Sequence, residues 1–257
     1  MSPGLPRLLV TRPAAQADEW VAGLKAEGLA AVALPLIAIS AGSNPAALDQ
    51  AWQDLALNRM LVFVSPNAVQ QFFAHRPEGQ VWPAQTLAAT VGPGSARALR
   101  EAGVPASLVR EPAADAPSFD SEALWQVLAP LDWQGARVLL VRGDGGREWL
   151  GERLRARGAV VEAVQSYSRV LPSLNAQEQQ QLAEALAAPH RHTWLLSSSE
   201  AVANLAALAP PGTDWSRARA VATHERIAER ATAQGFGRVV LARPQLPAVA
   251  AAARALS

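Results

Sequence analysis

The stretch RVLLVRGDGGREWLGERLRARG, residues 137–158, contains the unit from which the chain is built. Its first six residues are almost continuously apolar, which is typical of a parallel strand covered on both faces. A glycine-rich turn follows, and residues 146–157 indicate a helix that ends at Gly158. The stretch therefore predicts a strand followed by a helix, the repeating unit of α/β folds.

Patterns of this kind alternate along the whole chain. Apolar runs are followed by alanine-rich stretches such as residues 14–27, where Trp20 and Leu24 fall on one helical face. We expect ten strands, with the ranges 7–12, 29–35, 60–65, 87–92, 107–110, 137–142, 160–167, 194–197, 218–223 and 238–242. Because a twisted open sheet seldom exceeds about ten strands, we expect an α/β protein with two doubly wound parallel sheets of about five strands each.

Two extended, proline-containing segments interrupt this alternation. Residues 33–40 (ALPLIAIS) and 167–174 (YSRVLPSL) are apolar and too long for tight turns between strand and helix. We expect them to form a paired crossover, with interdomain connectors at residues 36–40 and 167–172. One domain is then discontinuous, residues 1–36 plus 172–257, and the other is continuous, residues 40–167.

A faint internal repeat supports two related domains. MLVFVSPNAV from Met60 resembles TWLLSSSEAV from Thr193, because in both segments a strand is followed by serine and, three residues later, by Ala-Val. Chance similarity between two strand–helix units is the alternative explanation.

The composition is that of a globular protein with no strong electrostatic partner. The chain has 257 residues, 50% of them hydrophobic, a formal net charge of +1 and no cysteine. We therefore expect neither nucleic acid nor a membrane as partner, and the absence of a long apolar run favours the cytoplasm. The four histidines lack metal-ligand spacing, so we expect no metal site, and we place His190 and His192 in an exposed loop.

Candidate ligand-binding residues follow the predicted strands, because doubly wound sheets bind ligands where helix N-termini present free N–H groups. Small hydroxyls, glycine and arginine dominate there, which favours anion binding over vigorous proton transfer. The candidates are Arg12, Ser65, Asn67, Gly92, Ser95, Arg142, Ser197, Ser198 and Thr223. As alternatives, Ser65 and Ser198 are simple helix N-caps, and residues 142–147 are a glycine-rich turn with surface arginines.

Tyr167 is the only tyrosine of the chain, and it falls where a predicted strand meets the second extended segment. A phenol can donate one hydrogen bond and act as a weak general acid. The alternative is a packing aromatic side chain with a solvated hydroxyl.

Six segments carry a family resemblance through their order and spacing. They are LLVTRP at Leu8, VSPNAV at Val64, VGPGSARAL at Val91, LLVRGDGGREWL at Leu139, the strand leading into Tyr167, and LLSSSEAV at Leu195. Together they resemble uroporphyrinogen-III synthases over nearly the whole chain. The resemblance implies two flavodoxin-like domains joined by a two-stranded connector. It also implies a lyase that cyclises hydroxymethylbilane to uroporphyrinogen III in heme biosynthesis, with loss of water and inversion of ring D.

The resemblance also assigns roles to the candidates. Tyr167 matches a cleft tyrosine that assists departure of the hydroxyl group. Loops that contact substrate carboxylates match Ser65, Asn67, Ser95, Ser197 and Ser198, and arginines near the cleft match Arg12 and Arg142. Many members carry Gly-Pro-Thr-Thr where this chain has Ala222-Thr223-His224-Glu225, which puts the role of Thr223 in doubt and makes His224 its candidate replacement.

The resemblance further implies a monomer that needs no metal or organic cofactor, and we expect a transient hand-off of substrate from hydroxymethylbilane synthase. The alternative function is a cytosolic two-lobe protein that binds a small anion without catalysis.

Overall fold

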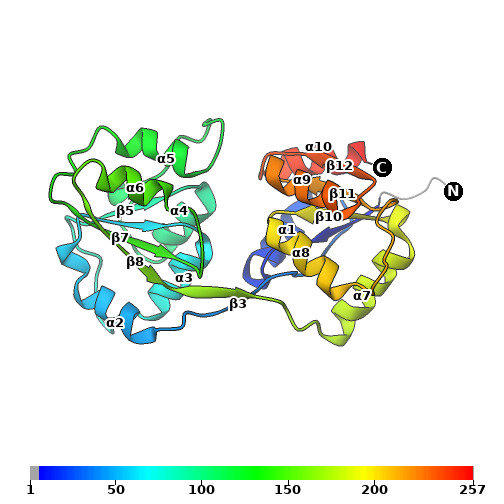
Figure 1. The fold of residues 1–257 in the computed structure, drawn as a ribbon, viewed down its shortest axis with the longest axis horizontal. Coiled ribbons are helices and arrows are strands. Elements are labelled where there is room, and N and C mark those ends of the chain that lie inside the picture. Colours follow the sequence, from blue (N-terminus) through cyan, green and yellow to red (C-terminus); the bar gives the residue numbers. More distant parts are fainter. Residues whose placement is uncertain (1–5, 257) are drawn as a thin grey trace. The chain divides into compact units, whose positions relative to one another are not determined.

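The computed structural model describes residues 6–256. The chain divides into two compact units, and each is built around a five-stranded sheet (Figure 1). Unit 1 comprises Met1–Ala38 and Val170–Ser257, and unit 2 comprises Ile39–Arg169.

The sheet of unit 1 has the strand order β12-β11-β10-β1-β2, with every neighbouring pair parallel. Its strands are β1 (Arg7–Val10), β2 (Ala31–Ala33), β10 (His192–Leu196), β11 (Arg219–Ala222) and β12 (Arg238–Leu241). Its helices are α1 (Ala14–Ala26), α7 (Ala176–Ala187), α8 (Ser199–Leu208), α9 (Glu225–Gln234) and α10 (Leu246–Ala255). Leu24 of α1 and Val249 of α10 pack with Leu8 and Leu195 in one fully buried cluster, so these two helices cover the same face of the sheet.

The sheet of unit 2 has the order β6-β5-β4-β7-β8, again wholly parallel. Its strands are β4 (Met60–Phe63), β5 (Leu87–Thr90), β6 (Val109–Arg110), β7 (Arg137–Arg142) and β8 (Val160–Gln165). Its helices are α2 (Pro45–Gln53), α3 (Pro66–Ala74), α4 (Pro93–Glu101), α5 (Ser121–Leu128) and α6 (Trp149–Arg155). The buried clusters place α2, α3 and α4 on one face and α5 and α6 on the other (Figure 1).

The two sheets share one topology with a permuted chain order. Numbered along the chain, the strands of unit 1 have the order 2-1-3-4-5, which is that of flavodoxin-like folds. Unit 2 has the same order if β7 and β8 are counted before β4, β5 and β6. The two strands of the sequence repeat, β4 and β10, therefore occupy equivalent central places, and the predicted fold class is confirmed.

A separate two-stranded sheet, β3 (Ala38–Ala41) and β9 (Tyr167–Val170), lies where the chain passes between the units. The strands run antiparallel, with the Ser40 hydroxyl donating to the carbonyl oxygen of Ser168 at 3.5 Å. All ten predicted strands are present, but the one expected over 160–167 is divided. Ser166 donates its N–H to the Arg142 carbonyl at 2.8 Å, and Tyr167 then begins β9.

One further expectation was wrong. His192 does not lie in an exposed loop but is buried in β10, where its Nδ1–H donates to the Ala188 carbonyl at 3.0 Å. Within residues 6–256, no helix is long and apolar enough to cross a membrane. The same residues contain no group of three or more His, Asp or Glu side chains arranged to hold a metal ion.

Candidate functional site

In unit 2, the carboxyl ends of β4, β5, β7 and β8 bring together residues from four parts of the sequence. Ser65 follows β4, Gly92 follows β5, Arg142 ends β7, and Tyr167 comes two residues after β8. Because all four strands are parallel, these residues gather at one edge of the sheet, where such folds bind ligands.

Ser65 is both a helix cap and the partner of the tyrosine. Its backbone is extended (φ −162°, ψ 163°), and its Oγ accepts the N–H of Ala68 at 3.2 Å at the start of α3. The same Oγ lies 3.0 Å from the phenolic oxygen of Tyr167, and either hydroxyl can donate. The N-cap interpretation of Ser65 is thus correct without excluding a second role, since one hydroxyl serves both contacts.

The ring of Tyr167 is held from two sides. It is only 4% exposed and packs into the core of unit 2 with Phe63, Val141 and Val164. On the other side it lies against Gly143, where a Cβ atom would come within 2.9 Å of the tyrosine Cζ. The rigid ring fixes the position of its hydroxyl beside Ser65 and leaves no room for a side chain at residue 143.

The other predicted residues of this edge lie at the start of α3 and α4. Asn67 and Ser95 are buried, at 7% and 3% exposure. Gly92 caps α4 without a side chain, and a Cβ at Gly94 would lie 3.7 Å from Pro66 Cγ. The two helix N-termini therefore lie side by side, and backbone N–H groups at their first turns can attract an anion.

Arg142 is engaged within its own loop. Its side chain, 24% exposed, forms an ion pair with Glu148, while Arg147 donates to both carboxylate oxygens of Glu122 at 2.6 and 2.5 Å. This second pair raises the pKa of Arg147, chiefly through the hydrogen bond with Glu122. Sequence reasoning singled out residues 142–147 but predicted no role for Gly143 or Arg147, and it missed Glu148. The glycine-rich turn that contains or adjoins all three was the available signal.

In unit 1, the predicted residues occupy the equivalent edge of the other sheet. Ser197 follows β10, and Ser198 caps α8 by accepting the N–H of Glu200 at 3.1 Å. Thr223 follows β11, and the cap of α9 is His224, whose Nδ1 accepts the N–H of Arg226 at 3.2 Å. The structure brings these residues together within unit 1, and the candidates described above belong to unit 2.

Arg12 of unit 1 is held against an aromatic ring. Its guanidinium lies 4.2 Å from the centre of the Trp20 ring, and its Nε is buried without a hydrogen-bond partner among residues 6–256. Burial lowers the pKa of Arg12 to about 10, against an opposing contribution from Glu19. The side chain is therefore still charged at neutral pH and can bind an anion.

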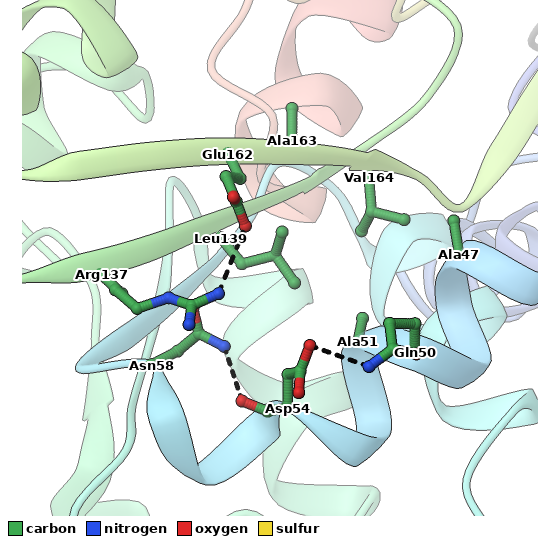
Figure 2. Close-up of a pocket in the computed structure, with 10 residues that line it drawn as sticks. All are labelled: Ala47, Gln50, Ala51, Asp54, Asn58, Arg137, Leu139, Glu162, Ala163 and Val164. Carbon is green, nitrogen blue, oxygen red and sulfur yellow. Dashed lines mark hydrogen bonds and ion pairs between the residues drawn. The ribbon is translucent and has the colours of Figure 1, made fainter.

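A cavity of about 440 Å³ in unit 2 lies between α2 and the strands β7 and β8 (Figure 2). Its polar groups face one another, with Arg137 paired to Glu162 at 3.6 Å and Gln50 donating to Asp54 at 3.0 Å. Arg137 is the first residue of β7 and therefore lies at the opposite end of that strand from Arg142.

Comparison with known proteins gives concordant matches. Residues 18–251 match the family described as uroporphyrinogen-III synthase HemD. The chain is 32% identical to uroporphyrinogen-III synthase of Salmonella typhimurium over 240 residues, covering 89% of this chain and 92% of that protein. It is also 32% identical to the Synechococcus elongatus synthase, covering 81% and 77%.

Solved structures show the same fold at lower identity. The synthase structure from Helicobacter pylori superposes with a TM-score of 0.60 at 14% identity, covering 98% of this chain and 100% of that chain. A Thermus thermophilus synthase structure gives 0.57 at 18% identity, covering 98% of each chain.

Proposed function

The chain belongs to the uroporphyrinogen-III synthase family, and from this premise we propose that it binds hydroxymethylbilane and that Tyr167 carries the acid step. The protein is a lyase that closes the linear tetrapyrrole to uroporphyrinogen III with loss of water. The match of residues 18–251 to the family is the observation that carries the function. The hydrogen bond between Tyr167 and Ser65 is the observation that carries the site.

The reaction requires that the substrate is held in a defined orientation and that a general acid gives modest assistance to the departure of the hydroxyl group. The C–O bond of the terminal hydroxymethyl group breaks, and the hydroxyl leaves as water once it receives a proton. The resulting azafulvene cyclises unaided to the symmetric isomer, so the enzyme must hold the chain while ring D inverts through a spiro intermediate. Tyr167 is suited to assist, because Ser65 and Gly143 fix where its phenol can donate a proton.

The substrate is an octacarboxylate, and the remaining candidates suit its anionic groups. In unit 2 these are Arg142 and the first turns of α3 and α4, with Ser65, Asn67, Gly92 and Ser95. In unit 1 they are Arg12 and the first turns that contain Ser197, Ser198 and Thr223. Each helix N-terminus contributes about 0.3–1 kcal/mol for a carboxylate at an exposed position.

Several finer properties belong to this proposal. The protein acts as a cytoplasmic monomer, and hydroxymethylbilane reaches it through a transient hand-off from hydroxymethylbilane synthase. The general acid and the anion-binding groups in this proposal are side chains and backbone N–H groups. Residues of the protein therefore carry out each proposed step.

A coupled assay tests the function. Hydroxymethylbilane is generated from porphobilinogen, the protein is added, and the oxidised uroporphyrin isomers are separated by chromatography. We expect isomer III to predominate. Isomer I alone, at the rate seen without the protein, would contradict the function and favour an anion-binding protein without catalysis.

Replacement of Ser65 tests its two contacts separately. Ser65→Ala should lower the free energy of unfolding by about 1 kcal/mol through loss of the α3 cap and should also lower kcat, since Tyr167 loses its partner. Asn44→Ala is the matched control, because Asn44 caps α2 of the same unit by accepting the Ala47 N–H at 3.2 Å. Equal kcat values for the two variants, measured beside urea unfolding, would show that Ser65 is only a cap.

A further inference from the structure

We propose that a small cavity beside α5 and α6 of unit 2 is a subsite for one pyrrole ring of the bilane. In this proposal Glu148 and Glu122 hold the subsite's arginines as internal carboxylates until the acid side chains of the substrate displace them. The inference rests on the proposed function. It adds the place where one pyrrole ring binds and the replacement of two internal ion pairs by ion pairs with the substrate.

The cavity has the size and lining for a single ring. It measures about 190 Å³, with an apolar wall that includes Val62, Leu140 and Leu150. Arg142 and the loop residues Gly145, Gly146 and Arg147 also line it. Sites that enclose a whole drug-sized ligand measure roughly 300–1,000 Å³, so this cavity suits one ring of the four, with its substituents directed towards the arginines.

The two arginines already hold carboxylates in binding geometry. Arg147 grips Glu122 through two parallel hydrogen bonds, and Arg142 is paired with Glu148. Each pyrrole of the bilane carries two carboxylates, an acetate and a propionate, which equals the number of acids held here. Asp120 also lines the cavity, where its carboxylate accepts the Ala123 N–H at 2.9 Å as the cap of α5 and contributes to the raised pKa of Arg147.

Exchange of one carboxylate for another is energetically easy at this position. The side chains of Arg142 and Glu148 are 24% and 46% exposed, and a single exposed ion pair of this kind contributes little net stability. Glu148 also has a second partner within reach, because its Oε2 lies 4.0 Å from Arg155 Nη1. A Cβ at Gly145 or Gly146 would meet no atom within 4 Å, so these two residues next to Arg147 are not packed against the rest of the unit, in contrast to Gly143 earlier in the loop.

The first test removes an internal competitor. Glu148→Gln should lower KM for hydroxymethylbilane about two- to fivefold, the equivalent of a surface ion pair, with kcat changed less than twofold. Glu148 makes no side-chain cap hydrogen bond, so α6 should form as before. Glu152→Gln is the charge-matched control, because Glu152 lies one turn further along α6 and forms no ion pair with a described residue. An unchanged or raised KM in Glu148→Gln would overturn the exchange.

The second test probes the cavity directly with porphobilinogen, a single pyrrole that carries one acetate and one propionate. In ¹⁵N-labelled wild-type protein, we expect its titration to shift the amide signals of Gly145 and Gly146 and the Nε–H signals of Arg142 and Arg147. Gly235, in unit 1, serves as the reference signal. Arg147→Gln should weaken this binding at least threefold and raise KM by a similar factor.

The outcomes separate the two proposals. If wild-type protein forms isomer III while porphobilinogen shifts none of the four signals and KM is unchanged in Glu148→Gln and Arg147→Gln, the subsite is wrong and the function stands. If the wild-type protein forms no isomer III, the function fails first, and the titration then reports only whether the cavity binds a dicarboxylic pyrrole.

Discussion

Replacing Tyr167 with phenylalanine is expected to lower kcat about a hundredfold, the lower range for loss of a general acid. The ring would keep its packing against Gly143 and the core, because only the phenolic oxygen is removed. Ser65 would keep its contact with Ala68 as the cap of α3. The lost hydrogen bond should cost about 1 kcal/mol of unfolding free energy, so the variant folds and the loss is chemical.

The measurement is the single-turnover formation of isomer III. Isomer I, which forms by spontaneous cyclisation in solution, provides an internal reference rate. The ratio of isomer I to isomer III should rise as the enzymatic path slows. Thr90→Val is a suitable control, since it removes a buried hydroxyl of the same unit that has no hydrogen-bond partner among the described residues. If Tyr167→Phe turned over at the wild-type rate, the phenol would have no part in the mechanism.

The fold could be predicted from the sequence because its determinants are local. Each strand of the two sheets is a short apolar run, and each glycine stop, such as Gly158, follows a helix with an amphipathic pattern. The permuted order of β4 to β8 could not be foreseen, because periodicity identifies strands but not their neighbours. His192 was misplaced for a related reason. Its polarity indicated a loop, whereas its ring satisfies a carbonyl four residues earlier and is then buried with the strand.

The site was less accessible to sequence reasoning because its contacts are long-range. Ser65 and Tyr167 were each singled out, but they are 102 residues apart, and no pattern along the chain predicts that their oxygens lie 3.0 Å apart. Arg142 was predicted as an anion-binding residue, and no pattern along the chain indicated that the structure would pair it with Glu148. Gly143 was interpreted only as part of a turn. Its requirement for a glycine depends on the tyrosine that packs against it, which sequence alone does not reveal.

Gly143→Ala should impair both stability and turnover, and it is expected to have the second-largest effect. The added methyl group would lie 2.9 Å from Cζ and 3.0 Å from Cε2 of Tyr167, atoms of a rigid ring that is packed on its other side by the core. Overpacking of this kind costs about 1–3 kcal/mol of unfolding free energy. Displacement of the phenol from Ser65 should lower kcat at least tenfold, since shifts of about 1 Å at a reacting group can cost about a hundredfold.

A double-mutant cycle distinguishes a positioning role from general damage to the loop. If Gly143 acts by placing the phenol, then Gly143→Ala should lower kcat in the wild-type background but scarcely lower it further in Tyr167→Phe, where no phenol is left to place. Gly23→Ala is the matched control, because its Cβ would overpack the side chain of Leu246 in unit 1, and it should lower the free energy of unfolding but leave kcat unchanged. Equal losses of kcat from Gly143→Ala in both backgrounds would mean that residue 143 affects catalysis by a route other than Tyr167. The contact between glycine and tyrosine would then be a matter of packing alone.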